Sequence, residues 1–170
     1  MREFWELSER VDEQPASVDC NEILQTVLLN LEKSIAESGA VVTADPLPSV
    51  MASPAPLIQL FQNLIGNAIK YLSHQPPRIA IAATKSTSEW VFSIADNGPG
   101  IDPKYGAEVF RVFKRLHSRS KYPGTGIGLA ICQKIVERFG GRIWVEPNPS
   151  GGSIFKFTIP DGIVLIEPQP

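Results

Sequence analysis

Two pairs of short apolar segments, each joined by a brief polar turn, constrain the fold of this chain more than any other feature. Residues 78–84 and 89–95 have the composition of strands and are separated by a polar stretch. Residues 142–146 and 153–159 form a second pair around a turn that contains two glycines. Strands joined so closely pair as antiparallel hairpins, which disfavours the strict strand-helix-strand rhythm of a parallel sheet.

Three other segments carry apolar residues at helical spacing. Helices are expected over about residues 21–38, from near residue 54 to residue 72, and after Gly124 as far as Gly140. Helices combined with hairpins, without a parallel rhythm, predict an α+β fold arranged as a two-layer sandwich. Two short apolar pieces around Val41 and Val50 flank a proline turn, and we expect them to pair with each other.

Composition limits the partners and the compartment. Sixteen Lys and Arg against eighteen Asp and Glu give the 170-residue chain a formal charge of −2, which offers no general attraction to nucleic acid or to an anionic membrane. Cys20 and Cys132 form neither a CxxC motif nor a disulfide framework, and no apolar run approaches the ~20 residues of a membrane span. We expect a cytoplasmic protein without direct membrane contact, or the cytosolic part of a larger membrane-bound sensor.

A glycine cluster opens the third expected helix, at Gly124-Thr125-Gly126-Ile127-Gly128. Unpaired N–H groups and the helix dipole favour a phosphate at such a position, although glycines before a helix are as commonly a simple turn. The cluster does not match the P-loop, the dinucleotide-binding fingerprint or the protein-kinase motifs.

Asp96 stands at the end of an apolar strand and is followed by a turn with two glycines. Its carboxylate could accept a hydrogen bond from an exocyclic amine. An Asx-turn that merely ends the strand is the more common outcome for such a sequence.

The second expected helix carries Asn63, Asn67 and Lys70 on one face, at spacings of four and three. A polar helix face is usually solvated, but Asn and the intervening Gly66 are poor choices for helix stability. Asn carbonyl oxygens suit Mg²⁺, and a neighbouring Lys can meet a phosphate oxygen.

Five cations and no acid occur between Phe110 and Lys121, which suggests a lid over phosphates within about residues 103–123. A solvated loop or a docking surface for an acidic protein remains the alternative. Phe110 and Phe113 are expected to tether this segment. His74 and His117 have no acid, Cys or His at metal-ligand spacing.

Four motifs in this order resemble the catalytic and ATP-binding domain of sensor histidine kinases, within the gyrase, Hsp90, kinase and MutL ATPase superfamily. They are NLIGNAIKY at 63–71 (N box), DNGPGI at 96–101 (G1 box), FRVFKRL at 110–116 (F box) and GTGIGLAI at 124–131 (G2 box). GGSIFKFTIP at 151–160 also matches, and residues 115–146 are most similar to phytochrome-type kinases. The resemblance implies the Bergerat ATP-binding fold, a mixed sheet of about five strands packed on three helices.

The resemblance also implies roles for individual residues. Asn67 would be the Mg²⁺ ligand, Asp96 would bind the adenine amine, and Ser153 would support the base through water. Catalytic roles in positioning and charge neutralisation would fall to Asn63, Lys70 and Arg115. The full set implied to bind ATP comprises Asn63, Asn67, Lys70, Tyr71, Asp96, Gly98, Gly100, Ile101, Leu116, Gly124, Thr125, Gly126, Ile127, Gly128, Leu129 and Ser153.

The expected function is therefore transfer of the γ-phosphoryl group of Mg-ATP to a histidine. The chain itself contains no H box, since neither His74 nor His117 fits one, so the acceptor would lie on a separate dimerisation domain or chain, with a response regulator as an indirect partner. We expect residues 1–17 to be the end of an upstream helix and a linker, 18–160 the catalytic domain, and 161–170 a tail. The alternatives are a non-catalytic nucleotide-sensing module and an ATPase of the same superfamily.

Overall fold

A computed structural model describes residues 15–70, 75–110 and 127–161 of the chain. Its larger sheet has five strands in the order β2-β4-β5-β7-β6. The strands are β2 (Val41–Ala44), β4 (Arg78–Lys85), β5 (Glu89–Asp96), β6 (Ile143–Pro147) and β7 (Ser153–Pro160). β2 is parallel to β4 and every other neighbouring pair is antiparallel, so the sheet is mixed, as expected.

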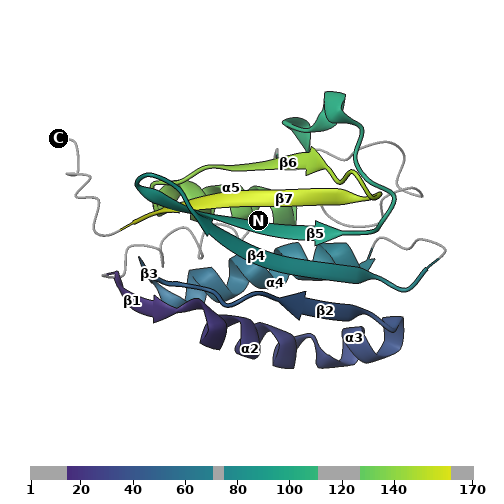
Figure 1. Cartoon of the computed structure of the whole chain (residues 1–170), viewed down its shortest axis with the longest axis horizontal. Coiled ribbons are helices and arrows are strands. Elements are labelled where there is room, and N and C mark those ends of the chain that lie inside the picture. The colour runs from purple at the N-terminus through teal and green to yellow at the C-terminus, as the bar shows by residue number, and fades with distance from the viewer. Residues whose placement is uncertain (1–14, 71–74, 111–126, 162–170) are drawn as a thin grey trace.

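Helices cover one face of this sheet (Figure 1). They are α2 (Cys20–Asn30), α3 (Glu32–Ser38), α4 (Pro54–Lys70) and α5 (Ile127–Arg138), with the short 3-10 helices η1 (Pro103–Tyr105) and η2 (Glu108–Phe110) between β5 and α5. Together with the sheet they form the expected α+β two-layer sandwich. The two predicted hairpins are confirmed, since β4 pairs with β5 and β6 with β7 in antiparallel register.

The core joins the two layers through aromatic rings. Phe61 of α4 meets Phe92 of β5 and Phe157 of β7 edge to face, with ring centroids 5.9 Å and 5.5 Å away. Phe92 and Phe157 stack on each other across neighbouring strands at 4.9 Å. All three side chains are fully buried, and such ring pairs stabilise by about 0.5–1.5 kcal/mol beyond the area they bury. The apolar stripe of α4 predicted from its spacing thus forms the centre of the core.

The first predicted helix is bent at Leu31, where ψ is 8° instead of the helical value. Hydrogen bonds still cross the bend, from the Leu31 N–H to the Val27 carbonyl and from the Ile35 N–H to the Leu31 carbonyl. The predicted segment 21–38 is therefore divided into α2 and α3, and the described residues contain four α-helices where three were expected.

The predicted pairing of the segments around Val41 and Val50 is wrong. β2 joins the large sheet, whereas β3 (Ser49–Ala52) pairs antiparallel with β1 (Ala16–Asp19), a strand that the sequence did not suggest. The intervening chain is held against the start of α2, because the Asn21 side chain accepts from the Leu47 N–H and donates to the Leu47 carbonyl, both at 2.9 Å. The proposed boundary between residues 17 and 18 falls inside β1.

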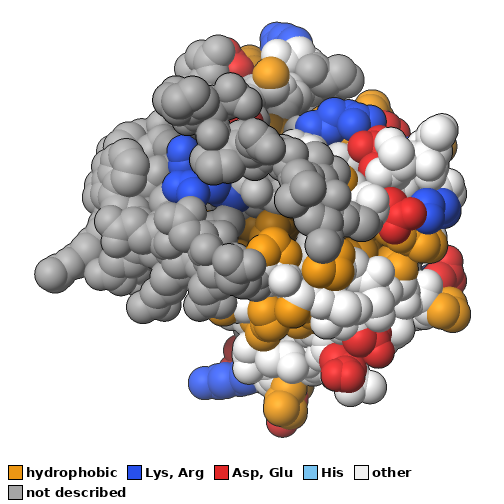
Figure 2. Space-filling view, turned by 90° about the vertical axis from the view of Figure 1, so that its left-hand side faces the viewer, with side chains coloured by type: hydrophobic (Ala, Val, Ile, Leu, Met, Phe, Trp, Pro, Cys, Tyr) orange, Lys and Arg blue, Asp and Glu red, His pale blue; other side chains and the backbone are white. Residues whose placement is uncertain are grey.

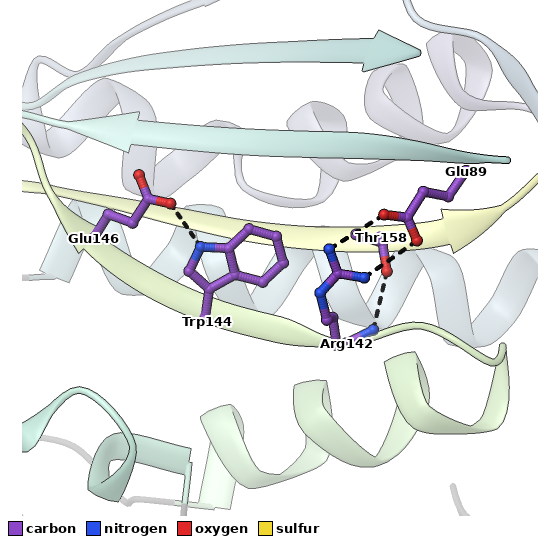
Figure 3. Close-up of polar contacts among 5 residues, drawn as sticks. All are labelled: Glu89, Arg142, Trp144, Glu146 and Thr158. Carbon is purple, nitrogen blue, oxygen red and sulfur yellow. Dashed lines mark hydrogen bonds and ion pairs between the residues drawn. The ribbon is translucent and has the colours of Figure 1, made fainter. Parts of the chain in front are cut away.

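The face of the sheet turned away from the helices carries a ladder of polar contacts (Figure 3). The Arg142 guanidinium pairs with Glu89 at 3.2 Å, and the Arg142 N–H donates to Thr158 Oγ1 at 3.0 Å. The indole N–H of Trp144 donates to the Glu146 carboxylate at 2.7 Å. This hydrogen bond and the one from Lys156 lower the pKa of Glu146. Exposed ion pairs of this kind each contribute ~0–1 kcal/mol, so the ladder adds little stability.

The described surface mixes charges of both signs with neutral and hydrophobic side chains, as Figure 2 shows for the side at the left of Figure 1. This mixture agrees with the small net charge of the chain. None of the described helices is both long and apolar enough to cross a bilayer.

Candidate functional site

Asp96 is the last residue of β5 and points to the helix-covered side of the sheet, because it alternates in phase with the buried Phe92 and Ile94. Its side chain is 9% exposed. The Oδ1 atom accepts hydrogen bonds from the N–H groups of Gly98 at 2.9 Å and Ser153 at 3.1 Å. Among the described residues no hydrogen bond reaches Oδ2, so one carboxylate oxygen is fixed and the other is left for a ligand.

Burial raises the pKa of Asp96, while the two backbone hydrogen bonds lower it and offset part of the effect. The predicted Asx-turn is present, since the Gly98 N–H bond closes it. The second bond comes from Ser153, which lies 57 residues further along the chain. A turn alone would leave the carboxylate at the surface, whereas here it is buried against a second strand.

Glycines surround Asp96 closely. Gly152 has φ of 95°, and a Cβ added there would lie 2.2 Å from the Asp96 carbonyl oxygen and 2.7 Å from Oδ1. Gly100 has φ of 82°, and an added Cβ would lie 3.3 Å from the Gly152 carbonyl oxygen. Both positions therefore favour glycine through conformation, and Gly152 through space as well. Ile101, next in the chain, is partly buried against the core.

Two further side chains, which the sequence did not single out, support the position of Asp96. The Asn148 side-chain amide donates to the Asp96 carbonyl at 2.9 Å, and Asn97 bridges to the start of β4 by accepting from the Arg78 N–H at 2.8 Å. Asn is common in turns for local reasons, so Asn148 in its turn does not indicate a contact with a residue 52 positions away. We call the group Asp96, Gly98, Asn148, Gly152 and Ser153 the Asp96 end of the site.

The polar face predicted on α4 is present, and it lies beside the start of α5. The Asn63 side-chain amide donates to the Gly128 carbonyl at 3.3 Å and its oxygen accepts from Gln59 at 2.9 Å. Asn67, one turn further along, is partly exposed and its side chain makes no hydrogen bond to a described residue. Lys70, the last residue of α4, is exposed.

α5 begins at Ile127, and Gly128 is its second residue. A Cβ added at Gly128 would meet no atom of the described residues within 4 Å, while Leu129 packs partly against the core. The first N–H groups of any α-helix lack a partner within the helix and favour an anion. We call Asn63, Asn67 and Lys70, together with the start of α5, the α4–α5 face.

The topology brings this face and the Asp96 end to the same end of the sandwich. Asp96 is paired with Ile79 at the beginning of β4, and seven residues (71–77) separate β4 from the end of α4. β7 begins at Ser153, beside Asp96, and a short turn joins it to the end of β6. α5 comes directly before β6 in the chain, so α5 ends near the start of β6 and begins at the end of the sandwich where Asp96 lies.

Several residues with predicted roles lie outside the described part of the chain: Tyr71, Arg115, Leu116, Gly124, Thr125 and Gly126. Ile127 is described as the first residue of α5 by its backbone. The expected lid is described as far as Phe110, whose ring is 4% exposed and meets Phe155 edge to face at 6.1 Å. The predicted tether at Phe110 is therefore present, and Phe113 is outside the described residues.

Known proteins resemble this chain in sequence. Residues 52–163 match the model of the family described as "Histidine kinase-, DNA gyrase B-, and HSP90-like ATPase". Cyanobacterial phytochrome A of Nostoc sp. (strain PCC 7120) is 51% identical over 156 residues, which cover 90% of this chain and 20% of that protein. The chain spans about a fifth of the length of the phytochromes among its curated relatives.

Solved structures agree with the sequence relatives. The catalytic domain of the histidine kinase ThkA superposes with a TM-score of 0.74 at 27% identity, covering 88% of this chain and 97% of that domain. Full-length ShkA, solved in complex with AMPPNP, superposes with a TM-score of 0.76 at 28% identity, covering 92% of this chain and 33% of ShkA. The chain therefore belongs to the histidine kinase-, DNA gyrase B- and HSP90-like ATPase family, as a catalytic domain of the histidine kinase type.

Proposed function

We propose that this chain binds Mg-ATP and transfers the γ-phosphoryl group to a histidine on a separate dimerisation domain or chain. The observation that carries the proposal is the buried Asp96 carboxylate, with Oδ1 held by two N–H groups, at the same end of the sandwich as the start of α5. A fixed acceptor for a base amine and a set of N–H groups for phosphates are what a nucleotide requires.

At the Asp96 end, Oδ2 would accept a hydrogen bond from the exocyclic amine of adenine. Guanine carries a carbonyl at the equivalent ring position, and a carbonyl would face the carboxylate without a shared proton. Burial strengthens the discrimination, because an unpaired polar group away from water costs about 1–3 kcal/mol. The Asp96 end would therefore select adenine over guanine.

On the α4–α5 face, the partly exposed Asn67 fits a role as Mg²⁺ ligand because its neutral oxygen makes no hydrogen bond to the described residues. The described residues contain no group of three or more His, Cys, Asp or Glu that could hold a metal, so phosphate oxygens and water would complete the shell. When bound, Mg²⁺ supplies neutralisation of the phosphate charge. Lys70 would add a positive charge nearby, and the start of α5 would donate N–H groups to the phosphates.

Asn63 favours transfer to a protein over hydrolysis. An amide has no basic lone pair with which to take a proton from water, and both ends of this amide are already engaged, with Gly128 and Gln59. Bound water would therefore attack slowly. The protein nucleophile would be a histidine, as the names of the relatives indicate for those proteins, and a response regulator would receive the phosphoryl group from it.

The test combines the purified chain, labelled Mg-ATP and a histidine-containing dimerisation domain of a phytochrome-type kinase. Acid-labile label on that domain, absent when its histidine is replaced by alanine, is the expected result. Binding of ATP without transfer to any acceptor histidine would instead support a nucleotide-sensing module. Rapid phosphate release without an acceptor would support an ATPase. The ATP hydrolysis rates of the unmodified chain and of Asn63→Glu would then show how much a carboxylate at this position accelerates hydrolysis.

A further inference from the structure

A side chain in the turn between β6 and β7 holds the backbone of Asp96. The Asn148 amide nitrogen donates to the Asp96 carbonyl oxygen at 2.9 Å. The paired register of β5 and β7 ends one residue before this carbonyl, since its last pair joins Ala95 and Ile154. Asn148 therefore supplies the donor that β7 no longer provides at this position.

The orientation of the Asn148 amide is fixed by its other contacts. Its Oδ1 accepts from the Ser150 N–H at 3.2 Å and from the Ser150 hydroxyl at 3.0 Å, so the nitrogen must face Asp96. The Asn148 backbone is also held, because its N–H donates to the Gly152 carbonyl at 3.0 Å and its carbonyl accepts from the Gly151 N–H at 2.8 Å. The side chain is thus anchored on the turn from which it reaches Asp96.

The same turn therefore contacts Asp96 at two separate atoms. Asn148 binds its backbone carbonyl, and Ser153 binds its carboxylate through Oδ1 at 3.1 Å. Between them Gly152 leaves no room for displacement toward the turn, since even a Cβ there would lie 2.2 Å from the carbonyl oxygen. Two fixed points on one residue determine the direction in which its remaining oxygen, Oδ2, faces.

We infer that Asn148 is a positioning residue for adenine selectivity, which acts by holding Asp96 in the orientation that presents Oδ2 to the base amine. This inference rests on the proposed function. Asn148 need not touch the nucleotide. Its loss would let Asp96 rotate or shift at its strand end, so a bond to the amine would weaken while contacts to the phosphates would not change.

The test compares Asn148→Asp with the control Ser150→Ala by calorimetric titration. The first substitution keeps the size of the side chain and its acceptor oxygen, but a carboxylate cannot donate to the Asp96 carbonyl. Ser150→Ala removes one donor to Asn148 and leaves the contact with Asp96 intact. Each protein is titrated with Mg-ATP and with Mg-ITP, which has a carbonyl in place of the exocyclic amine, and urea unfolding establishes that each is folded.

We expect Asn148→Asp to weaken ATP binding about 3- to 10-fold, the range for one hydrogen bond, with a smaller change for ITP, so that the ATP/ITP affinity ratio falls. In an Asp96→Asn background the second substitution should have no further effect on that ratio. Equal losses for both nucleotides, or an unchanged ratio, would overturn the inference and leave the proposed function standing. Failure of the unmodified chain to bind ATP would overturn the proposed function and this inference with it.

Discussion

The Asp96 end and the α4–α5 face differ in how much of their geometry the folded chain already fixes. Asp96 is buried and receives three hydrogen bonds, two at Oδ1 and one at its carbonyl. On the α4–α5 face, Asn63 is engaged on both sides, but Asn67 and Lys70 make no side-chain hydrogen bond to a described residue and reach solvent. The fold therefore fixes the Asp96 end through hydrogen bonds, whereas on the α4–α5 face the side chains of Asn67 and Lys70 have no such bonds to the described residues.

This difference follows from what each region would recognise. A flat base is distinguished from another by one or two hydrogen bonds, which cost less to form when the protein groups are already in position before binding. Phosphates and a hydrated cation are recognised by charge, which falls off gradually with distance and tolerates mobile side chains. Substitutions that disturb the packing of the Asp96 end should therefore change both stability and affinity, and those on the α4–α5 face should change Mg-ATP chemistry with little change in stability.

The largest effect is expected for Asn67→Ala. Removal of a metal ligand should lower Mg-dependent phosphoryl transfer about 100-fold or more, because a positioned cation contributes several kcal/mol to charge stabilisation. The free energy of unfolding should change by less than about 0.5 kcal/mol, since the side chain is partly exposed and Ala suits a helix. Transfer assays and urea unfolding measure the two quantities.

Gln62→Ala provides the control, because Gln62 lies on the same helix but contacts Asn30 of α2. It should leave transfer unchanged. If Asn67→Ala transfers phosphate as fast as the unmodified chain, Asn67 is not the metal ligand.

A second large effect is expected at Gly152, with Gly151 as its matched control. Both glycines have positive φ, 95° and 103°, so replacement by Ala imposes a similar backbone cost of about 1 kcal/mol. Only at Gly152 does the new Cβ also collide with Asp96, whereas at Gly151 it meets no atom of the described residues within 4 Å. Gly152→Ala should therefore destabilise by about 3 kcal/mol and impair ATP binding, and Gly151→Ala should cost about 1 kcal/mol and leave binding intact. Similar unfolding curves for the two variants would show that the contact with Asp96 is looser than described.

Asp96→Asn separates recognition from folding. Asn can accept the same two N–H bonds through its oxygen, so the fold should be retained. Its amide nitrogen would face the adenine amine, and loss of a hydrogen bond to a charged acceptor should weaken ATP binding by ~1.5–3 kcal/mol, about 10- to 150-fold. Titration with ATP and GTP measures this, and GTP should bind the unmodified chain poorly. Equal affinities of the unmodified chain for ATP and GTP would contradict the role of Asp96.

The sequence predicted those features that depend on local pattern. The stripe of α4, both hairpins and the turn after Asp96 each follow from residues close together in the chain, and all are present. The roles that the resemblance implies for Asp96, Asn67 and the other site residues stay predictions, because geometry alone does not test them.

Features that depend on distant residues were not predicted. β1 is a four-residue strand whose partner, β3, lies about 30 residues further along, and nothing in its polar composition indicates pairing. The bond from Asn148 to Asp96 spans 52 residues. At the bend at Leu31 two helical hydrogen bonds are kept, and the residue there is an ordinary helix former. Such contacts are determined by tertiary packing, which short-range periodicity does not report.

The smallest expected effect is the pH dependence of stability that Asp96 contributes. Burial raises the pKa of this carboxyl in the folded chain above its value in the unfolded chain. A raised folded-state pKa means that the folded chain holds the proton more tightly, so this group's contribution to stability is fully present below the unfolded-state pKa and is lost as pH rises through the folded-state pKa. As pH rises from the unfolded-state pKa to the folded-state pKa, the unfolding free energy of the unmodified chain should therefore fall relative to that of Asp96→Asn. Above the folded-state pKa the difference between the two proteins should stay constant.

Urea unfolding of both proteins from acidic to neutral pH measures the difference. A shift in the opposite direction would mean that the N–H bonds of Gly98 and Ser153 outweigh burial, and hence that the Asp96 end is organised around the charged carboxylate even without a nucleotide.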